Sequence, residues 1–171
     1  MLRIAEHFHD SDLGRQRQGN EDNYFVRAPL FVVADGMGGA QAGEVASELA
    51  VKRFEQGLPD GAAPAEALPE LIRQANAQIH EQARTDSQRA GMGTTVTAAY
   101  VDGDAVVVAH VGDSRCYLLR DGELIRLTHD HSLVGELVAR GKLTEEQAES
   151  HPQRSVITRA LGPEPTVEVD V

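Results

Sequence analysis

Four acidic residues stand beside glycine or asparagine in this 171-residue chain: Glu21, Asp22, Asp35 and Asp113. Each falls at the end of an expected strand or in a loop between strands, and strand ends on one rim of a sheet can converge in space. Carboxylate oxygens of this kind suit Mg²⁺ or Mn²⁺, which keep several waters and need few protein ligands. Any one of them alone is better explained as a turn or capping residue. The four together favour a divalent-cation site.

The sharpest local pattern is DGMGG at residues 35–39. Its glycines would let a backbone carbonyl or amide approach an ion closely. The simpler interpretation is an Asp-Gly turn between a strand and a helix. A phosphate-binding loop fits poorly, because the Walker pattern requires Lys and then Ser or Thr, whereas Ala40, Gln41 and Ala42 follow here. A dinucleotide loop would need glycine at position 41.

Arg17 lies in a loop rich in glycine and glutamine, four residues before Glu21. A guanidinium can bind two phosphate oxygens at once. An exposed loop arginine is more often only solvated. The prediction that Arg17 binds phosphate therefore depends on its spacing to Glu21 and Asp22.

Other nucleophile and metal patterns are missing. Cys116 would need an arginine six residues later to act as a cysteine phosphatase, but position 122 is glycine, so we assign Cys116 to packing. His7 and His9 have no third zinc ligand at a suitable spacing. His129 and His131 flank Asp130, where a structural or capping role is expected. No serine occurs in a nucleophile-elbow sequence.

Periodicity predicts the elements that would position these residues. A short strand is expected at 2–10, and two strands are expected at 23–27 and 30–35. Helical spacing covers 41–57, with Val45, Leu49 and Phe54 on one side, and 65–85, with five apolar residues at spacings of three and four. These five residues are Leu68, Leu71, Ile72, Ala75 and Ile79.

Two hairpins follow the helices. Asp102-Gly103 and Asp121-Gly122 are two-residue loops of the favoured kind, and two successive hairpins predict an antiparallel meander within a single layered α+β domain spanning 1–171. Residues 131–162 are predicted to be helical and polar, with breaks at Gly141 and Pro152. Residues 166–171 alternate as a strand does.

Composition limits the partners. The formal charge of −11 opposes binding to nucleic acid and to anionic membranes. A single cysteine allows no intrachain disulfide, and the N-terminus carries no signal-peptide pattern. No apolar run approaches the length of a bilayer span. We therefore expect a cytoplasmic protein.

Five stretches, in this order, resemble the type 2C, metal-dependent (PPM) serine/threonine protein phosphatases. The stretches are 11–22 (SDLGRQRQGNED), 33–39 (VADGMGG), 91–95 (GMGTT), 110–115 (HVGDSR) and 150–154 (SHPQR). Each motif is modest, but their order across the chain is specific. The DGMGG version resembles the bacterial branch of the family.

The resemblance implies a sandwich of two antiparallel β-sheets flanked by helices (α-β-β-α), here incomplete at the C-terminus. Asp35 would bridge two Mn²⁺ or Mg²⁺ ions, and the Gly36 carbonyl would hold one of them. Glu21 and Asp22 would bind metal directly or through water. Arg17 would bind the substrate phosphate.

The resemblance also implies a third, weaker metal site at Asp113 and a flap at about 129–162 beside the cleft. The expected reaction is hydrolysis of phosphoserine and phosphothreonine in proteins, by a hydroxide that bridges the two metals, opposing a serine/threonine kinase. Met37 stands where many eukaryotic members carry a histidine that could act as a general acid, and methionine cannot donate a proton.

A larger departure concerns two further aspartates of the family, in Ser-Asp-Gly and Gly-x-Asp-Asn stretches, which do not occur within 1–171. We therefore expect the chain alone to be a poor phosphatase with an exposed apolar sheet face. The alternative is a catalytically incomplete module that binds a phosphoprotein or metal. A nucleotide-binding α/β protein is disfavoured by the failed glycine patterns.

Overall fold

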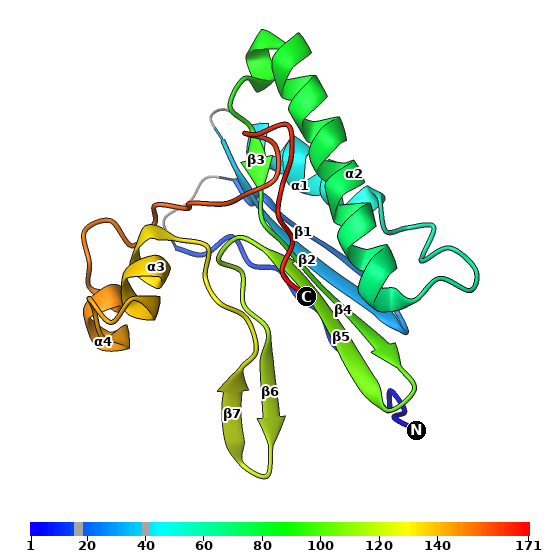
Figure 1. Cartoon of the computed structure of the whole chain (residues 1–171). Coiled ribbons are helices and arrows are strands. Elements are labelled where there is room, and N and C mark those ends of the chain that lie inside the picture. The colour runs from blue at the N-terminus through cyan, green and yellow to red at the C-terminus, as the bar shows by residue number, and fades with distance from the viewer. Residues whose placement is uncertain (16–18, 39–41) are drawn as a thin grey trace.

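The computed structural model describes residues 1–15, 19–38 and 42–171, and its centre is a five-stranded antiparallel sheet (Figure 1). The strands follow one another in the order β1-β2-β4-β5, with the short β3 paired to β2. Their bounds are β1 Asp22–Arg27, β2 Leu30–Met37, β3 Gly93–Thr94, β4 Val96–Asp102 and β5 Ala105–Val111. The strands predicted at 23–27 and 30–35 are thus confirmed, and Pro29 lies in the turn between them.

Two helices cover one face of this sheet, α1 (Ala42–Lys52) and α2 (Pro64–Thr85) (Figure 1). Alternate residues of β2, namely Leu30, Val32 and Ala34, are buried toward these helices. The intervening Val33 is 47% exposed on the opposite, outer face. The sheet therefore has one buried face and one largely open face, as expected from the sequence.

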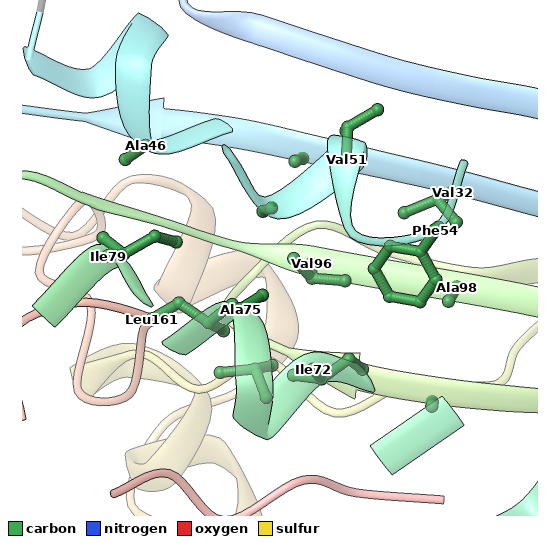
Figure 2. Close-up of a cluster of buried hydrophobic side chains, with 14 of the residues drawn as sticks. Val32, Ala46, Val51, Phe54, Ile72, Ala75, Ile79, Val96, Ala98 and Leu161 are labelled. Carbon is green, nitrogen blue, oxygen red and sulfur yellow. The ribbon is translucent and has the colours of Figure 1, made fainter. Parts of the chain in front are cut away.

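The core between helices and sheet is aliphatic, with one large aromatic ring (Figure 2). Ile72, Ala75 and Ile79 from α2 meet Val96 and other strand residues, and all are fully buried. Of the five residues predicted for this face of α2, four are fully buried and Leu71 is half-buried.

The second helix is confirmed, but the first is shorter than predicted. α1 ends at Lys52 rather than at 57, because residues 53–56 form turns that place Phe54 in the core. The most deeply buried face of α1 carries Ala42, Ala46 and Ala50, which allow close approach to the sheet, whereas Val45 and Leu49 pack at its margin.

The second sheet is a hairpin of β6 (Tyr117–Arg120) and β7 (Glu123–Arg126), which projects from the body (Figure 1). Asp121 and Gly122 both have positive φ, as the predicted two-residue loop requires. The fold class, antiparallel sheets flanked by helices, is confirmed. The predicted continuous meander is wrong within the described residues, because the chain turns away after β5 at Gly112, whose φ is +113°.

Two smaller predictions fail. Residues 2–10 form no strand; instead His7 and His9 place their rings against Phe31 and Tyr24 on the outer sheet face. The loop of the first hairpin is Gly103-Asp104 rather than Asp102-Gly103. The reason is that Asp102 still pairs with Ala105.

The C-terminal third contains two short helices, α3 (Leu133–Ala139) and α4 (Glu145–Glu149). Residues 150–162, predicted to be helical, are irregular and are held by isolated bridges such as Thr94–Leu161. The strand predicted at 166–171 is reduced to one bridge between His110 and Asp170, although Val167 and Val169 do pack on the core. Among the described helices, none combines the length and apolar character of a membrane span.

The packing of α2 yields a prediction. Ile72→Ala removes a fully buried side chain from the interface with the sheet and should lower the free energy of unfolding by about 2–5 kcal/mol. Urea denaturation measures this change. Arg73→Ala, at an exposed position of the same helix, is the matched control and should change it by less than about 0.5 kcal/mol. Equal effects of the two substitutions would contradict the assignment of this helix face.

Candidate metal centre

Asp22 and Asp35 lie directly opposite each other on β1 and β2. Both line a groove of about 580 Å³ on the outer face of the sheet, together with Tyr24, Val33 and Thr97. Like charges directly opposite on antiparallel strands destabilise a sheet. A divalent cation held between these carboxylates would offset that repulsion, and hard oxygen donors are the ligands that Mg²⁺ and Mn²⁺ prefer.

The backbone of Asp35 is fixed by the two threonines that follow Gly93. Its carbonyl accepts the Thr95 N–H at 2.9 Å and the Thr94 hydroxyl at 3.0 Å. Its N–H donates to the Thr95 hydroxyl at 3.0 Å. Three hydrogen bonds therefore hold the Asp35 backbone, and they fix the direction in which the Asp35 side chain leaves the strand.

Gly36 lies where strand and helix meet most closely. A Cβ at this position would come within 2.1 Å of the Gly43 carbonyl oxygen, and a Cβ at Gly43 would come within 2.7 Å of Glu21 Oε1. Both glycines are needed for close approach rather than for unusual φ. The Glu21 carboxylate thus lies against the first turn of α1, where the helix dipole favours negative charge.

Ser47 ties α1 to the start of β1. Its hydroxyl donates to the Glu21 carbonyl at 2.5 Å and accepts from Asn23 Nδ2 at 3.0 Å, and the side chain is fully buried. On the other side, Asn20 Oδ1 accepts the Asp22 N–H at 3.0 Å. The Asn20–Asn23 stretch is therefore tied to α1 through Ser47 and braced internally by Asn20.

Asp113 follows β5 and lines a second cavity of about 490 Å³, and Arg115 lines both this cavity and the groove. Burial, and then the neighbouring charge of Asp130, raise the pKa of the Asp113 carboxyl above its ordinary value. The two sites are joined through Ser114, whose Oγ lies 2.7 Å from Thr95 Oγ1. Thr95 thus contacts the Asp35 backbone and the Asp113 turn at once.

Arg115 is held by Asp130 in a two-pronged ion pair, with Nε–Oδ1 at 3.0 Å and Nη2–Oδ2 at 2.6 Å. The hydrogen bonds that the guanidinium donates to Asp130 raise the pKa of Arg115 above its ordinary value. Cys116, next in the chain, is half-buried, and burial raises the pKa of its thiol. A thiol of this kind is a poor nucleophile at neutral pH, which agrees with the packing role predicted for Cys116.

His110 is a buried histidine beneath the Asp113 turn, with 2% of its surface exposed. Its Nε2–H donates to the His129 carbonyl at 3.1 Å, and Nδ1 lies 3.0 Å from the Thr97 hydroxyl. Its ring stacks on His131 with centroids 4.8 Å apart. Burial, and then the proximity of His131, lower the pKa of His110 below 6.5.

The structure therefore brings Asp22 and Asp35 together, places Glu21 beside them against α1, and puts Asp113 in the adjoining cavity. Arg17 lies outside the described residues. Within the described part of the chain, no three His, Cys, Asp or Glu side chains gather closely enough to hold an ion by themselves.

Sequence reasoning missed the positioning roles of Thr95 and Ser47. The GTT stretch carried a usable signal, because hydroxyls beside a glycine often bind neighbouring backbone. The sequence around Ser47 carried no signal that distinguishes it from an ordinary helix residue.

The chain is similar to known proteins in both sequence and fold. Residues 15–164 match the protein phosphatase 2C family. The serine/threonine phosphatase stp of Listeria welshimeri is 44% identical over 171 residues, covering 94% of this chain and 68% of that protein. The crystal structure of the serine/threonine phosphatase Stp1 from Staphylococcus aureus superposes with a TM-score of 0.85 at 37% identity, covering 93% of this chain and 66% of that one.

A third similar structure is the catalytic domain of the serine/threonine protein phosphatase PstP in complex with two manganese ions. It has a TM-score of 0.81 and 40% identity, and the match covers 94% of this chain and 69% of that one. The chain belongs to the protein phosphatase 2C family of metal-dependent serine/threonine protein phosphatases, in its bacterial branch. It spans about two-thirds of the length of these relatives.

The buried state of His110 predicts a pH dependence of stability. Its pKa is lowered on folding, so the unfolded chain binds the proton more readily, and stability should fall as the pH drops below about 6.5. The urea midpoint measured between pH 7.5 and 5.5 should decrease, and His110→Asn should flatten that decrease. Equal pH slopes in the two proteins would show that His110 does not titrate on unfolding.

Proposed function

We propose that this chain hydrolyses phosphoserine and phosphothreonine in proteins at the end of the groove where Asp22 faces Asp35. The carrying observation is the β1–β2 register, which sets two carboxylates opposite each other beside Gly36. Membership of the protein phosphatase 2C family supports the same reaction.

We propose Mn²⁺ or Mg²⁺ as the cofactor, with two ions at Asp35 and a third, weaker site at Asp113. When bound, such ions would polarise phosphoryl oxygens and make water a better nucleophile. In this proposal Asp35 would hold both ions of the pair and the Gly36 carbonyl would hold one. Glu21 and Asp22 would hold metal directly or through water.

The remaining roles belong to substrate binding. We assign the phosphate contact to Arg17, because a guanidinium can bind two phosphoryl oxygens and stabilise the charge that develops on them. Residues 129–162, which include α3, α4 and most of the residues that line the second cavity, would form the flap beside the cleft. In this proposal the groove of about 580 Å³ would hold the peptide that flanks the phosphorylated residue.

The proposed partners are phosphoproteins, including a serine/threonine kinase whose action the phosphatase would oppose. A formal charge of −11 disfavours nucleic acid and anionic membranes as partners. A cytoplasmic location is part of the proposal and is supported by the single cysteine, which suits a reducing compartment.

A second candidate is a phosphatase-like module that binds a phosphoprotein or metal without turnover. The observation that favours it is the sparse donor set, because among the described residues no three His, Cys, Asp or Glu side chains gather closely enough to hold an ion. Mn²⁺-dependent release of phosphate from a phosphothreonine peptide separates the two candidates, since the module would bind the peptide and release nothing.

Asp35→Asn tests the proposal directly. A neutral amide supplies one oxygen where the carboxylate supplies two, so the substitution should abolish metal-dependent hydrolysis in the full phosphatase domain. Folding should be little changed, because the Thr94 and Thr95 contacts are made to the Asp35 backbone. Phosphate release and the urea midpoint are the two measurements. Activity near the parent level would remove Asp35 from the site.

A further inference from the structure

His131 makes two hydrogen bonds to one residue, Gly112, which directly precedes Asp113. The His131 N–H donates to the Gly112 carbonyl at 2.8 Å, and the Gly112 N–H donates to His131 Nδ1 at 3.0 Å. The backbone N–H and C=O of Gly112 are thus both bound by a single histidine, of which only 7% is exposed.

Gly112 cannot relax this geometry by itself. Its φ of +113° lies in the region that favours glycine, and a Cβ here would come within 2.5 Å of the Thr95 methyl group. The turn is therefore pressed against Thr95 on one side and bound by His131 on the other. The direction in which the chain leaves it sets where the Asp113 side chain points.

The tautomer of His131 follows from these contacts. Since the Gly112 N–H donates to Nδ1, that nitrogen accepts and the ring proton is on Nε2. Nε2–H donates to Asp170 Oδ2 at 3.1 Å, and Asp170 Oδ1 in turn accepts from Arg159 Nη1 at 2.7 Å. Arg159 Nη1 also lies 3.0 Å from His131 Nε2, but both nitrogens carry protons in this tautomer, so they are two donors that share Asp170 and do not bind each other. Burial alone would raise the pKa of Asp170, but the hydrogen bonds from His131 and Arg159 outweigh it and lower that pKa. Asp170 thus remains an acceptor at neutral pH.

We propose that His131 is a positioning residue that orients Asp113 through Gly112, and that Asp170 fixes the His131 tautomer this requires. The proposal rests on the proposed function, in which Asp113 holds a divalent cation at the weaker site. Under this proposal the orientation of the Asp113 carboxylate depends on His131 and Asp170, which lie 18 and 57 positions further along the chain. His131, for which the sequence predicted only a structural or capping role, would then affect the metal affinity of the site at Asp113.

Two substitutions separate the two sides of the imidazole. In His131→Asn the amide oxygen can replace Nδ1 as the acceptor for Gly112, while the contact with Asp170 is lost. In His131→Gln the longer amide can still reach Asp170, but the Gly112 N–H loses its acceptor. Each variant loses one hydrogen bond, so a merely structural role would affect both alike.

The first measurement is Mn²⁺ binding by titration calorimetry, with Asp113→Asn defining the weaker site. His131→Gln should weaken that site by about 10-fold or more, as is typical when a group that orients a ligand is removed, and His131→Asn should weaken it clearly less. Equal affinities in the two variants would overturn the proposal. If Asp113→Asn leaves all Mn²⁺ binding unchanged, the metal role of Asp113 fails and the metal-orienting role of His131 fails with it. The proposed reaction at Asp35 would be unaffected by that result.

The second measurement needs neither metal nor a folded variant. Nitrogen NMR of the unmodified chain should show His131 with an unprotonated Nδ1 and a protonated Nε2, and the Gly112 amide should be protected from hydrogen exchange. Where the variants fold, protection of Gly112 should survive in His131→Asn and be lost in His131→Gln. A proton on Nδ1, or an unprotected Gly112 amide in the unmodified chain, would refute the proposed pairing of His131 with Gly112.

Discussion

The register between β1 and β2 is the constraint on which the proposed metal centre depends. It sets Asp22 opposite Asp35, so that two carboxylates separated by a hairpin lie side by side at the end of one groove. Side chains alternate between the faces of a strand, and a slip of one residue would turn Asp35 toward the helices. Burial of Leu30, Val32 and Ala34 against α1 and α2 prevents that slip. The aliphatic core therefore fixes the position of the charged site.

A second layer of hydrogen bonds extends this order across the same end of the sheet to its β5 edge. Thr95 contacts the Asp35 backbone and Ser114, while Thr97 donates to the Ser114 carbonyl at 2.9 Å. Within the described residues, every buried side-chain nitrogen and oxygen has a hydrogen-bond partner. Such satisfied networks restrict a site to one arrangement, and incomplete ones are costly. Asp35 and Asp113, which lie in adjoining cavities, are positioned by the same few hydroxyl groups.

The sequence predicted the fold well where local patterns and tertiary packing agree. α2 follows its apolar spacing within one residue at its start, and the Asp121-Gly122 turn needs no more than the two residues themselves. Predictions failed where long-range contacts decide the outcome. Phe54 leaves the helical pattern because the core accepts its ring after α1 has ended. Residues 2–10 contact the sheet through the rings of His7 and His9, in edge and tilted arrangements, rather than by a ladder.

The same distinction applies to the site. Asp22 and Asp35 could be named from their types and spacing, and the strand pairing places them together. The contacts of Thr95 and His131 could not, because their partners Asp35 and Gly112 are 60 and 19 residues away, and only the folded chain brings them near. Arg17 and residues 39–41 lie outside the described residues, so the phosphate contact remains a prediction.

The most direct test of the central claim is the effect of Mn²⁺ on thermal unfolding in three proteins: the unmodified chain, Asp22→Asn and Asp60→Asn. A ligand that binds only the folded state stabilises it by about 2.7 kcal/mol at 100 times its Kd. If the opposed carboxylates hold the ion, the midpoint of the unmodified chain should rise with Mn²⁺, and so should that of Asp60→Asn, which changes an exposed carboxylate in the loop before α2. Asp22→Asn should lose most of the rise. An equal rise in all three proteins would contradict the account, because the ion would then be held elsewhere.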